Sequence, residues 1–101
     1  MVYGYEVKKE YRFDKKRRWR VDYAVLVNNK FTIAIEIEGG VWLYGRHNRA
    51  AGFLRDMEKY NALAKQGVVL LRYTPDTPWL AIEADIKETL ENLQKNENEE
   101  A

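Results

Sequence analysis

The residues of this chain best suited to chemistry are three carboxylates, Asp22, Glu36 and Glu38. They fall in two stretches, residues 19–27 and 31–38, where apolar and polar side chains alternate as in a half-buried β-strand. All three acids occupy even positions, so they share one face of both strands. Carboxylates gathered on one face are suitable ligands for a divalent metal ion, which is the simplest chemistry this pattern indicates.

The pairing register of the two stretches decides whether the acids meet. A three-residue hairpin loop, Asn28-Asn29-Lys30, places Asp22 opposite Glu36 and Arg20 opposite Glu38. A two-residue loop would put the first two acids on opposite faces and would split the apolar set, so the hydrophobic pattern favours the longer loop. Like charges directly across a strand pair, with Cβ atoms roughly 5 Å apart, destabilise it. A bound metal ion would compensate for that repulsion.

The alternative interpretation is a solvated face whose acids pair with Arg18 and Arg20. Ala24 and Ala34 on the same face favour the metal site, because small side chains let a helix pack closely over the acids. The odd positions form the opposite, apolar face: Val21, Tyr23, Val25, Val27, Phe31, Ile33, Ile35 and Ile37.

Length and composition restrict the class of protein. A chain of 101 residues is expected to form one domain with one core. It contains no cysteine, which excludes a thiolate metal site and suits a reducing cytoplasm. Its single histidine, His47, excludes a zinc site that needs two imidazoles. No apolar stretch approaches the ~20 residues of a membrane span, and no signal-peptide pattern opens the chain.

The net charge of +1 conceals an asymmetry along the chain. Residues 1–55 carry twelve Lys or Arg against six Asp or Glu, and residues 56–101 carry five against ten. The basic run Lys15-Lys16-Arg17-Arg18-Trp19-Arg20 leads into the strand that bears Asp22. Such a run is either a solvated loop or a surface for nucleic-acid phosphates. Beside an acidic pocket it suits phosphodiester chemistry, with cations on the backbone and a metal at the scissile phosphate.

The remaining stretches predict an α/β (α+β) fold with a mixed four-stranded sheet flanked by helices. Residues 2–13 alternate like a strand that pairs with the first acidic stretch. The apolar run at residues 68–71 is typical of a buried strand, and a crossover helix over about 46–66 makes it parallel to its neighbour. A last helix follows Thr77-Pro78.

Each predicted helix has an apolar stripe at three- and four-residue spacing. In the first helix it consists of Ala50, Phe53, Leu54, Met57, Tyr60 and Ala64, and in the last of Ile82, Ile86, Leu90 and Leu93. Residues 1–93 are expected to form the single domain, and residues 94–101 a frayed or disordered acidic tail.

This order of elements resembles the core of the PD-(D/E)XK nuclease superfamily, with a hairpin that bears Asp and then Glu-x-Glu. Locally the chain is similar to small phage and bacterial endonucleases near the very-short-patch-repair and VRR-type branches. The resemblance covers roughly residues 10–75 and rests on Arg18-Trp19-Arg20-Val21-Asp22-Tyr23-Ala24, Glu36-Ile37-Glu38-Gly39-Gly40, Gly45-Arg46-His47, Asp56-Met57-Glu58-Lys59-Tyr60-Asn61 and Val69-Leu70-Leu71-Arg72-Tyr73.

The resemblance implies that Asp22 is the first metal-binding acid and Glu36 the acid of the (D/E)-x-K pair. The next motif position normally holds a lysine that orients or activates the attacking water, and here it holds Glu38, a candidate further metal ligand. Relatives sometimes carry the missing cation on the following helix, which makes Lys59 the best substitute. Its alternative role is an ion pair with Asp56, three residues earlier.

Other implied roles are less defined. Arg46 and Arg49 are lesser substitutes for the lysine, and His47 is either a phosphate contact or proton carrier or a surface residue at a helix start. Superfamily members usually have a helix before the first strand, for which this chain leaves no room. Glu6 or Glu10 is then the candidate extra acid. A second subunit would cover the sheet face left exposed, so a homodimer is expected.

Together these features predict a Mg²⁺-dependent endodeoxyribonuclease, with Mn²⁺ able to substitute, in the cytoplasm of a bacterium or phage-infected cell. Asp22, Glu36 and Glu38 are the expected metal ligands, Lys59 stabilises developing charge, and the DNA contacts are Lys15, Lys16, Arg17, Arg18, Arg46, His47 and Arg49. No base-reading element is recognisable, so backbone- or structure-directed binding is expected. The alternatives are a catalytically inactive nucleic-acid-binding module of the same fold and a small structural domain.

Overall fold

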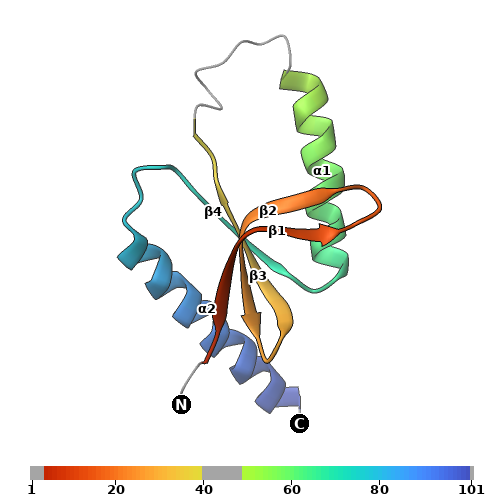
Figure 1. Cartoon of the computed structure of the whole chain (residues 1–101). Coiled ribbons are helices and arrows are strands. Elements are labelled where there is room, and N and C mark those ends of the chain that lie inside the picture. The colour runs from red at the N-terminus through yellow and green to blue at the C-terminus, as the bar shows by residue number, and fades with distance from the viewer. Residues whose placement is uncertain (1–3, 40–48, 101) are drawn as a thin grey trace.

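The structure, a computed structural model, describes the backbone of residues 4–39 and 49–100 and the side chains of residues 4–39 and 54–97. The elements in chain order are β1 (Glu6–Asp14), β2 (Trp19–Val27), β3 (Lys30–Ile37), α1 (Arg49–Lys65), β4 (Val69–Tyr73) and α2 (Trp79–Glu100) (Figure 1). The predicted α+β class is confirmed. No helix in the described part of the chain is long and apolar enough to cross a membrane.

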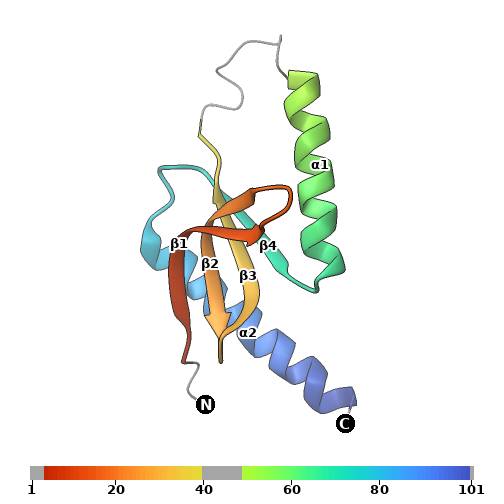
Figure 2. The same cartoon turned by 45° about the vertical axis from the view of Figure 1, so that its right-hand side comes forward.

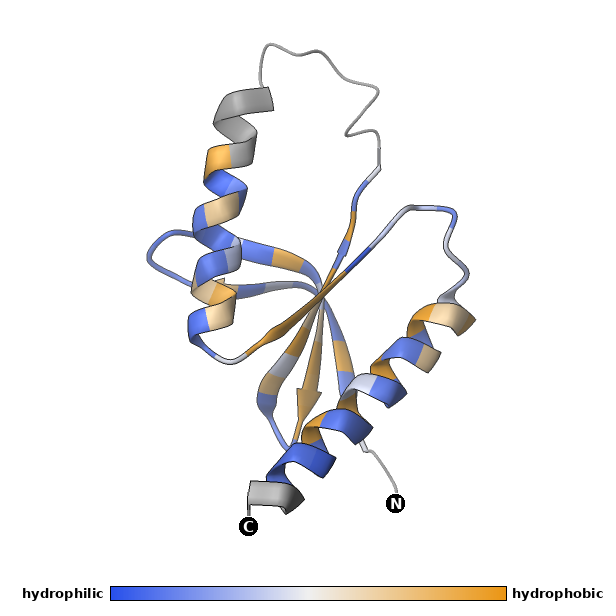
Figure 3. Ribbon diagram, turned by 180° about the vertical axis from the view of Figure 1, so that it is seen from behind, coloured by the Kyte–Doolittle hydropathy of each residue, from blue (hydrophilic) through white to orange (hydrophobic). Residues whose placement is uncertain are grey.

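The strands form one mixed sheet in the order β1-β2-β3-β4. The first two pairs are antiparallel, whereas β3 and β4 are parallel and are connected through α1. This is the predicted crossover. The two helices pack on opposite faces of the sheet, and apolar residues concentrate along the strands between them (Figure 3).

The face covered by α2 contains the larger aliphatic core. Val25, Ile33 and Ile35 are buried there against Ile82 and Ile86 of α2. The predicted stripe on the last helix is therefore confirmed. Because α2 covers this face, the exposed sheet face that suggested a homodimer is not present, and the homodimer stays a prediction without that argument. The helix also continues to Glu100, so residues 94–100 are helical rather than frayed.

On the other face, α1 lies over the small residues of the central strands. Ala24 and Ala34 are fully buried and belong to the same cluster as Leu63 of α1, which confirms that a helix packs closely over the alanines. Leu54 and Met57 are exposed, although they belong to the predicted apolar stripe. The stripe was misjudged because α1 packs through its C-terminal half, while its N-terminal half extends beyond the sheet (Figure 2).

The hairpin between β2 and β3 has the predicted register near the acids, but its loop is shorter than predicted. Its loop has two residues, Asn28 and Asn29, both with positive φ, instead of the predicted three. The register then shifts by one residue, because Thr32 forms a bulge beyond the Leu26–Phe31 pair. The bulge restores the predicted pairing toward the acids and moves Phe31 to the α1 face.

A second irregularity lies beside the acids. Glu10 has φ of 48° and sits between the Lys9–Tyr23 and Tyr11–Val21 pairs, which places it opposite Asp22. Beyond this kink the hairpin of β1 and β2 bends (Figure 1). Val21 consequently packs in the cluster beneath α1, with Ala24, Ala34 and Leu63. Its odd position had predicted the opposite face, which α2 covers.

The end of α1 determines where β4 begins. Gly67 takes φ of 77°, its N–H donates to the Ala64 carbonyl at 3.0 Å, and the Val68 N–H donates to the Leu63 carbonyl at 3.0 Å. These two bonds define a Schellman motif, which needs glycine at the left-handed position. The predicted helix stop at Gly67 is confirmed.

Candidate functional site

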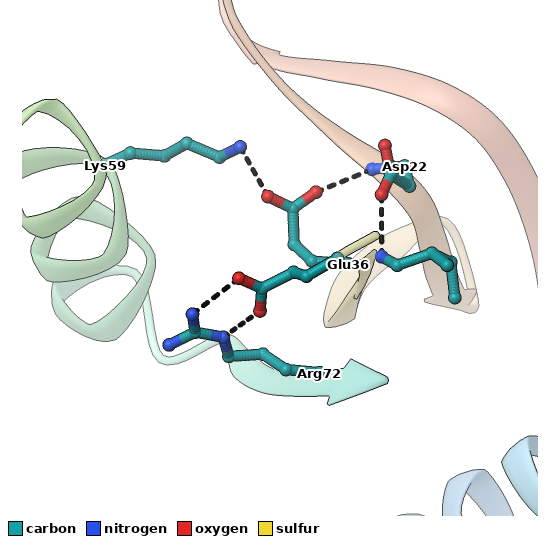
Figure 4. A network of polar contacts seen from close by, with 6 residues as sticks. Asp22, Glu36, Lys59 and Arg72 are labelled. Atoms are coloured by element: carbon teal, nitrogen blue, oxygen red, sulfur yellow. Dashed lines mark hydrogen bonds and ion pairs between the residues drawn. The ribbon is translucent and has the colours of Figure 1, made fainter. Parts of the chain in front are cut away.

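A row of charged side chains crosses the sheet on the face covered by α1. Glu36 on β3 is the register partner of Arg72 on β4. Continuing the strand registers places Asp22 opposite Glu36 and Glu10 opposite Asp22. The row lies near the carboxyl ends of the parallel strands β3 and β4, where α1 supplies further polar side chains (Figure 4).

Each of the two central acids, Asp22 and Glu36, accepts a hydrogen bond from a backbone N–H on the strand of the other. Glu36 Oε2 accepts a hydrogen bond from the Asp22 N–H at 3.0 Å, and Asp22 Oδ2 accepts one from the Ile37 N–H at 2.7 Å. The last β2–β3 register pair is Tyr23–Ile35, so these N–H groups lie just beyond the ladder. The backbone donors reduce the repulsion between the carboxylates, and the predicted approach of the two acids is present.

Lys59 approaches the acids from α1. Its Nζ lies 2.7 Å from Glu36 Oε1, and the side chains of the pair are only 15% and 11% exposed. Lys59 lies one helical turn before the fully buried Leu63, so packing of that leucine directs the lysine toward the sheet. Its ion-pair partner is Glu36 and not Asp56, the alternative weighed from the sequence.

Glu38 pairs with Arg72 and not with the arginine expected from the sequence. Arg72 Nη2 donates to Glu38 Oε1 at 2.6 Å, and Arg72 Nε donates to Glu38 Oε2. Arg20 instead lies 3.4 Å from Glu10. In the described part of the chain, neither Arg18 nor Arg20 forms an ion pair with the three acids, so the solvated-face interpretation is wrong in its pairings.

Tyr60 lies between the two ion pairs. The Arg72 guanidinium lies 5.0 Å from the centroid of its ring, and Lys59 Nζ lies 5.8 Å from it. Burial, followed by the charges of Asp56, Glu36 and Glu38, raises the pKa of the phenol well above its ordinary value. Tyr60 is therefore a neutral hydroxyl at physiological pH.

No functional role is predicted for Tyr60 or Arg72 from the sequence pattern. Tyr60 was assigned to an apolar stripe, and it does pack against the α1-side core. Arg72 lies two residues after Leu70, on the same face of β4, in a stretch that is otherwise apolar. A charged residue at such a position is the signal in the sequence that could have indicated a functional role. Its place beside Glu36 depends on the parallel register, which the sequence pattern does not specify.

The acids differ from the expected three-carboxylate metal site. Among the described residues, no three acidic or histidine side chains are grouped closely enough to hold a metal ion. Glu36 accepts a hydrogen bond from the Asp22 backbone N–H, whereas Glu38 is engaged by Arg72. Mg²⁺ is commonly bound by only one or two carboxylates and completes its coordination with water and substrate phosphates. Asp22 and Glu36 match this number of carboxylates, and both oxygens of Glu36 already accept hydrogen bonds, from Lys59 and from the Asp22 N–H.

The basic run forms the turn between β1 and β2, and Arg17 is part of its structure. The Arg17 N–H donates to Asp14 Oδ1 at 2.9 Å, and Nη1 lies 3.3 Å from Asp14 Oδ2. The backbone bond from Arg17 lowers the pKa of Asp14. The guanidinium also lies 4.9 Å from the centroid of the Trp19 ring. Arg17 is therefore held within the turn.

The other predicted nucleic-acid contacts are divided between two regions. Lys15, Lys16 and Arg18 are exposed in the turn, and Arg18 has φ of 60°. Arg46 and His47 lie outside the described residues, as does the side chain of Arg49.

Comparison of the chain with protein-family models, with curated proteins and with solved structures finds no match. The resemblance to the PD-(D/E)XK superfamily therefore stays a prediction.

Proposed function

We propose that this protein is a metal-dependent endonuclease that hydrolyses DNA phosphodiester bonds. The observation that carries the proposal is the arrangement of Lys59, Glu36 and Asp22, in which the buried Glu36 carboxylate accepts hydrogen bonds from the Lys59 ammonium and from the backbone N–H of a second acidic residue. Phosphoryl transfer needs anionic ligands for a metal ion and a fixed cation near the developing charge. This arrangement offers both kinds of group on one face of the sheet.

Each residue has a distinct role in the proposed reaction. Asp22 and Glu36 would hold Mg²⁺, or Mn²⁺ in its place, which would polarise the phosphate and lower the pKa of a water molecule. Lys59 fixes the orientation of Glu36 and presents a positive charge beside it. DNA phosphates contact the exposed cations of the β1–β2 turn, in a bacterium or a phage-infected cell.

A second candidate is a nucleic-acid-binding module without catalysis, favoured by a specific observation. Both carboxylate oxygens of Glu36 already accept hydrogen bonds from within the protein, and Glu38 is engaged by Arg72. In that case the charged row would stabilise the fold, and DNA would bind without being cleaved.

The test is incubation of the protein with supercoiled plasmid, branched DNA and RNA in Mg²⁺, Mn²⁺ or EDTA. Cleavage of DNA that requires the metal supports the nuclease, and a salt-sensitive shift without products supports the binding module. The variant Asp22→Asn keeps an acceptor for the Ile37 N–H, and Asp22 is exposed, so the fold should persist. Its cleavage rate should fall at least about a hundredfold.

The matched control is Glu91→Gln, which removes one exposed charge from α2 on the far face of the sheet. It should cleave at the wild-type rate. Equal rates for Asp22→Asn and wild type in Mg²⁺ would show that the assignment is wrong. Glu36 is a poorer test residue than the sequence suggested, because it is buried and paired, so its replacement also disturbs the fold.

A further inference from the structure

Arg72 is a fixed cation at the edge of the acidic pair. It lies beside Glu36 in the sheet register, and its guanidinium is held by the carboxylate of Glu38 and by the ring of Tyr60. The bonds to Glu38 use Nε and Nη2, so Nη1 takes no part in them. A guanidinium has five N–H donors and suits the bidentate binding of phosphate oxygens.

The two ion pairs of the site differ in their access to solvent. The Lys59–Glu36 pair is shielded beneath α1, with both side chains at most 15% exposed. In the Arg72–Glu38 pair the arginine side chain is 51% exposed. An ion pair so open to water contributes little to folding stability. The open pair is therefore the one that an incoming anion can reach.

We propose, resting on the proposed function, that Arg72 binds a DNA phosphate next to the metal-binding acids and that Glu38 positions its guanidinium. In this arrangement Glu38 acts through Arg72 and is not a metal ligand. The neutral ring of Tyr60 also supports the guanidinium, which lies 5.0 Å from the ring centroid.

The first measurement is the affinity for a short DNA duplex in EDTA over a series of salt concentrations. Without metal there is no cleavage, so binding is measured alone. Arg72→Gln should weaken binding and reduce the slope of log affinity against log salt by about 0.9, the value for one lost phosphate contact. The control is Lys87→Gln on the exposed side of α2, which removes the same charge and should leave the slope unchanged.

The second measurement separates positioning from simple charge. Glu38→Gln removes a negative charge, which by electrostatics alone would strengthen DNA binding. If Glu38 positions Arg72, the same variant should weaken binding severalfold, and it should not weaken binding any further when combined with Arg72→Gln. The Mg²⁺ concentration for half-maximal cleavage should match that of the wild type, because no metal ligand is lost.

An unchanged affinity and salt slope in Arg72→Gln would overturn the inference, as would tighter binding by Glu38→Gln or an increased Mg²⁺ requirement. A wild-type protein that binds no DNA would overturn it as well. These outcomes are distinct from failure of the proposed function. A slope change in Arg72→Gln without metal-dependent cleavage by the wild type would support the phosphate contact and reject the nuclease. Cleavage with an unaffected Arg72→Gln would reject the contact alone.

Discussion

Lys59 on α1 and Glu36 on β3 form a mostly buried ion pair, with 2.7 Å between Nζ and Oε1, although they are 23 positions apart in the sequence. Glu36 is the one buried charged side chain among the residues that the structure describes. Burying a carboxylate is costly unless it is paired and hydrogen-bonded, and Lys59 together with the Asp22 N–H meets that requirement. The pair therefore connects α1 to the sheet at the position where the proposed chemistry occurs.

Removing Lys59 should destabilise the protein. In Lys59→Met the carboxylate of Glu36 remains buried without its cation, and the free energy of unfolding should fall by roughly 3 kcal/mol. Urea denaturation followed by circular dichroism measures the change. Lys65→Met, at the exposed end of the same helix, is the control and should have almost no effect. Equal stabilities of the two variants would mean that the ion pair is not formed in solution.

The turn between β2 and β3 offers a test of the hairpin. Asn29 has φ of 66°, a left-handed conformation that asparagine and glycine tolerate and alanine does not. Asn29→Ala should lower the free energy of unfolding by about 1 kcal/mol, whereas Asn29→Gly should be tolerated. Urea denaturation compares the two. Similar loss of stability in both would argue against the two-residue turn.

This hairpin also shows how far the sequence specifies the fold. The alternation of apolar residues correctly predicted that Asp22 and Glu36 share a register. The loop itself was predicted wrongly, because asparagines favour a two-residue turn while the alternation needs one more residue. The bulge at Thr32 resolves this conflict, and a bulge at threonine leaves no recognisable signal in the sequence.

The sequence predicted which side chains share a face of the sheet. It did not predict contacts that depend on how strands distant in the sequence align. Ala24 and Ala34 indicated that a helix covers the acids, and this helix does supply Lys59. The pairing of Glu38 with Arg72 depends on how β4 aligns with β3 after the crossover. That alignment is set by the packing of Leu63 and the turn at Gly67, which strand periodicity does not encode.

Tyr60 should make the protein sensitive to alkaline pH. Its pKa is raised in the folded state, mainly by burial, so folding favours the neutral phenol. This contribution is fully present below the ordinary tyrosine pKa of 10.0 and is lost as the pH rises toward the higher pKa of the folded state. Above pH 10.0, the free energy of unfolding should therefore fall less steeply with pH in Tyr60→Phe than in the wild type. The difference between the two slopes should be up to about 1.4 kcal/mol per pH unit.

The measurement is urea denaturation of wild type and Tyr60→Phe at several pH values on both sides of the tyrosine pKa. Loss of the lysine charges affects both proteins alike, so only the difference between them reports on Tyr60. That difference should be constant near neutral pH and should change only at alkaline pH. Parallel curves across the whole range would show that the phenol is not perturbed by folding.

The basic turn should contribute to DNA affinity through Lys15, Lys16 and Arg18. Arg17 is left unchanged, because its bonds to Asp14 stabilise the turn. In the triple variant Lys15→Gln, Lys16→Gln, Arg18→Asn, the asparagine tolerates the left-handed backbone at residue 18. Binding should weaken to a similar degree for all DNA sequences, and the salt slope should fall by about 0.9 for each phosphate contact that is lost.

Turnover at saturating DNA should change far less in this variant than in Asp22→Asn, because the turn positions the backbone and does not take part in the chemistry. The charge-matched control replaces Lys65, Lys87 and Lys95, which are exposed on the two helices, with glutamine. If both triple variants reduce the salt slope equally, the loss reflects net charge alone. Wild-type affinity and salt slope in the turn variant would show that the turn is only solvated. A loss of affinity and slope in the turn variant alone, and not in the control, would place the DNA backbone along the strand that leads to Asp22.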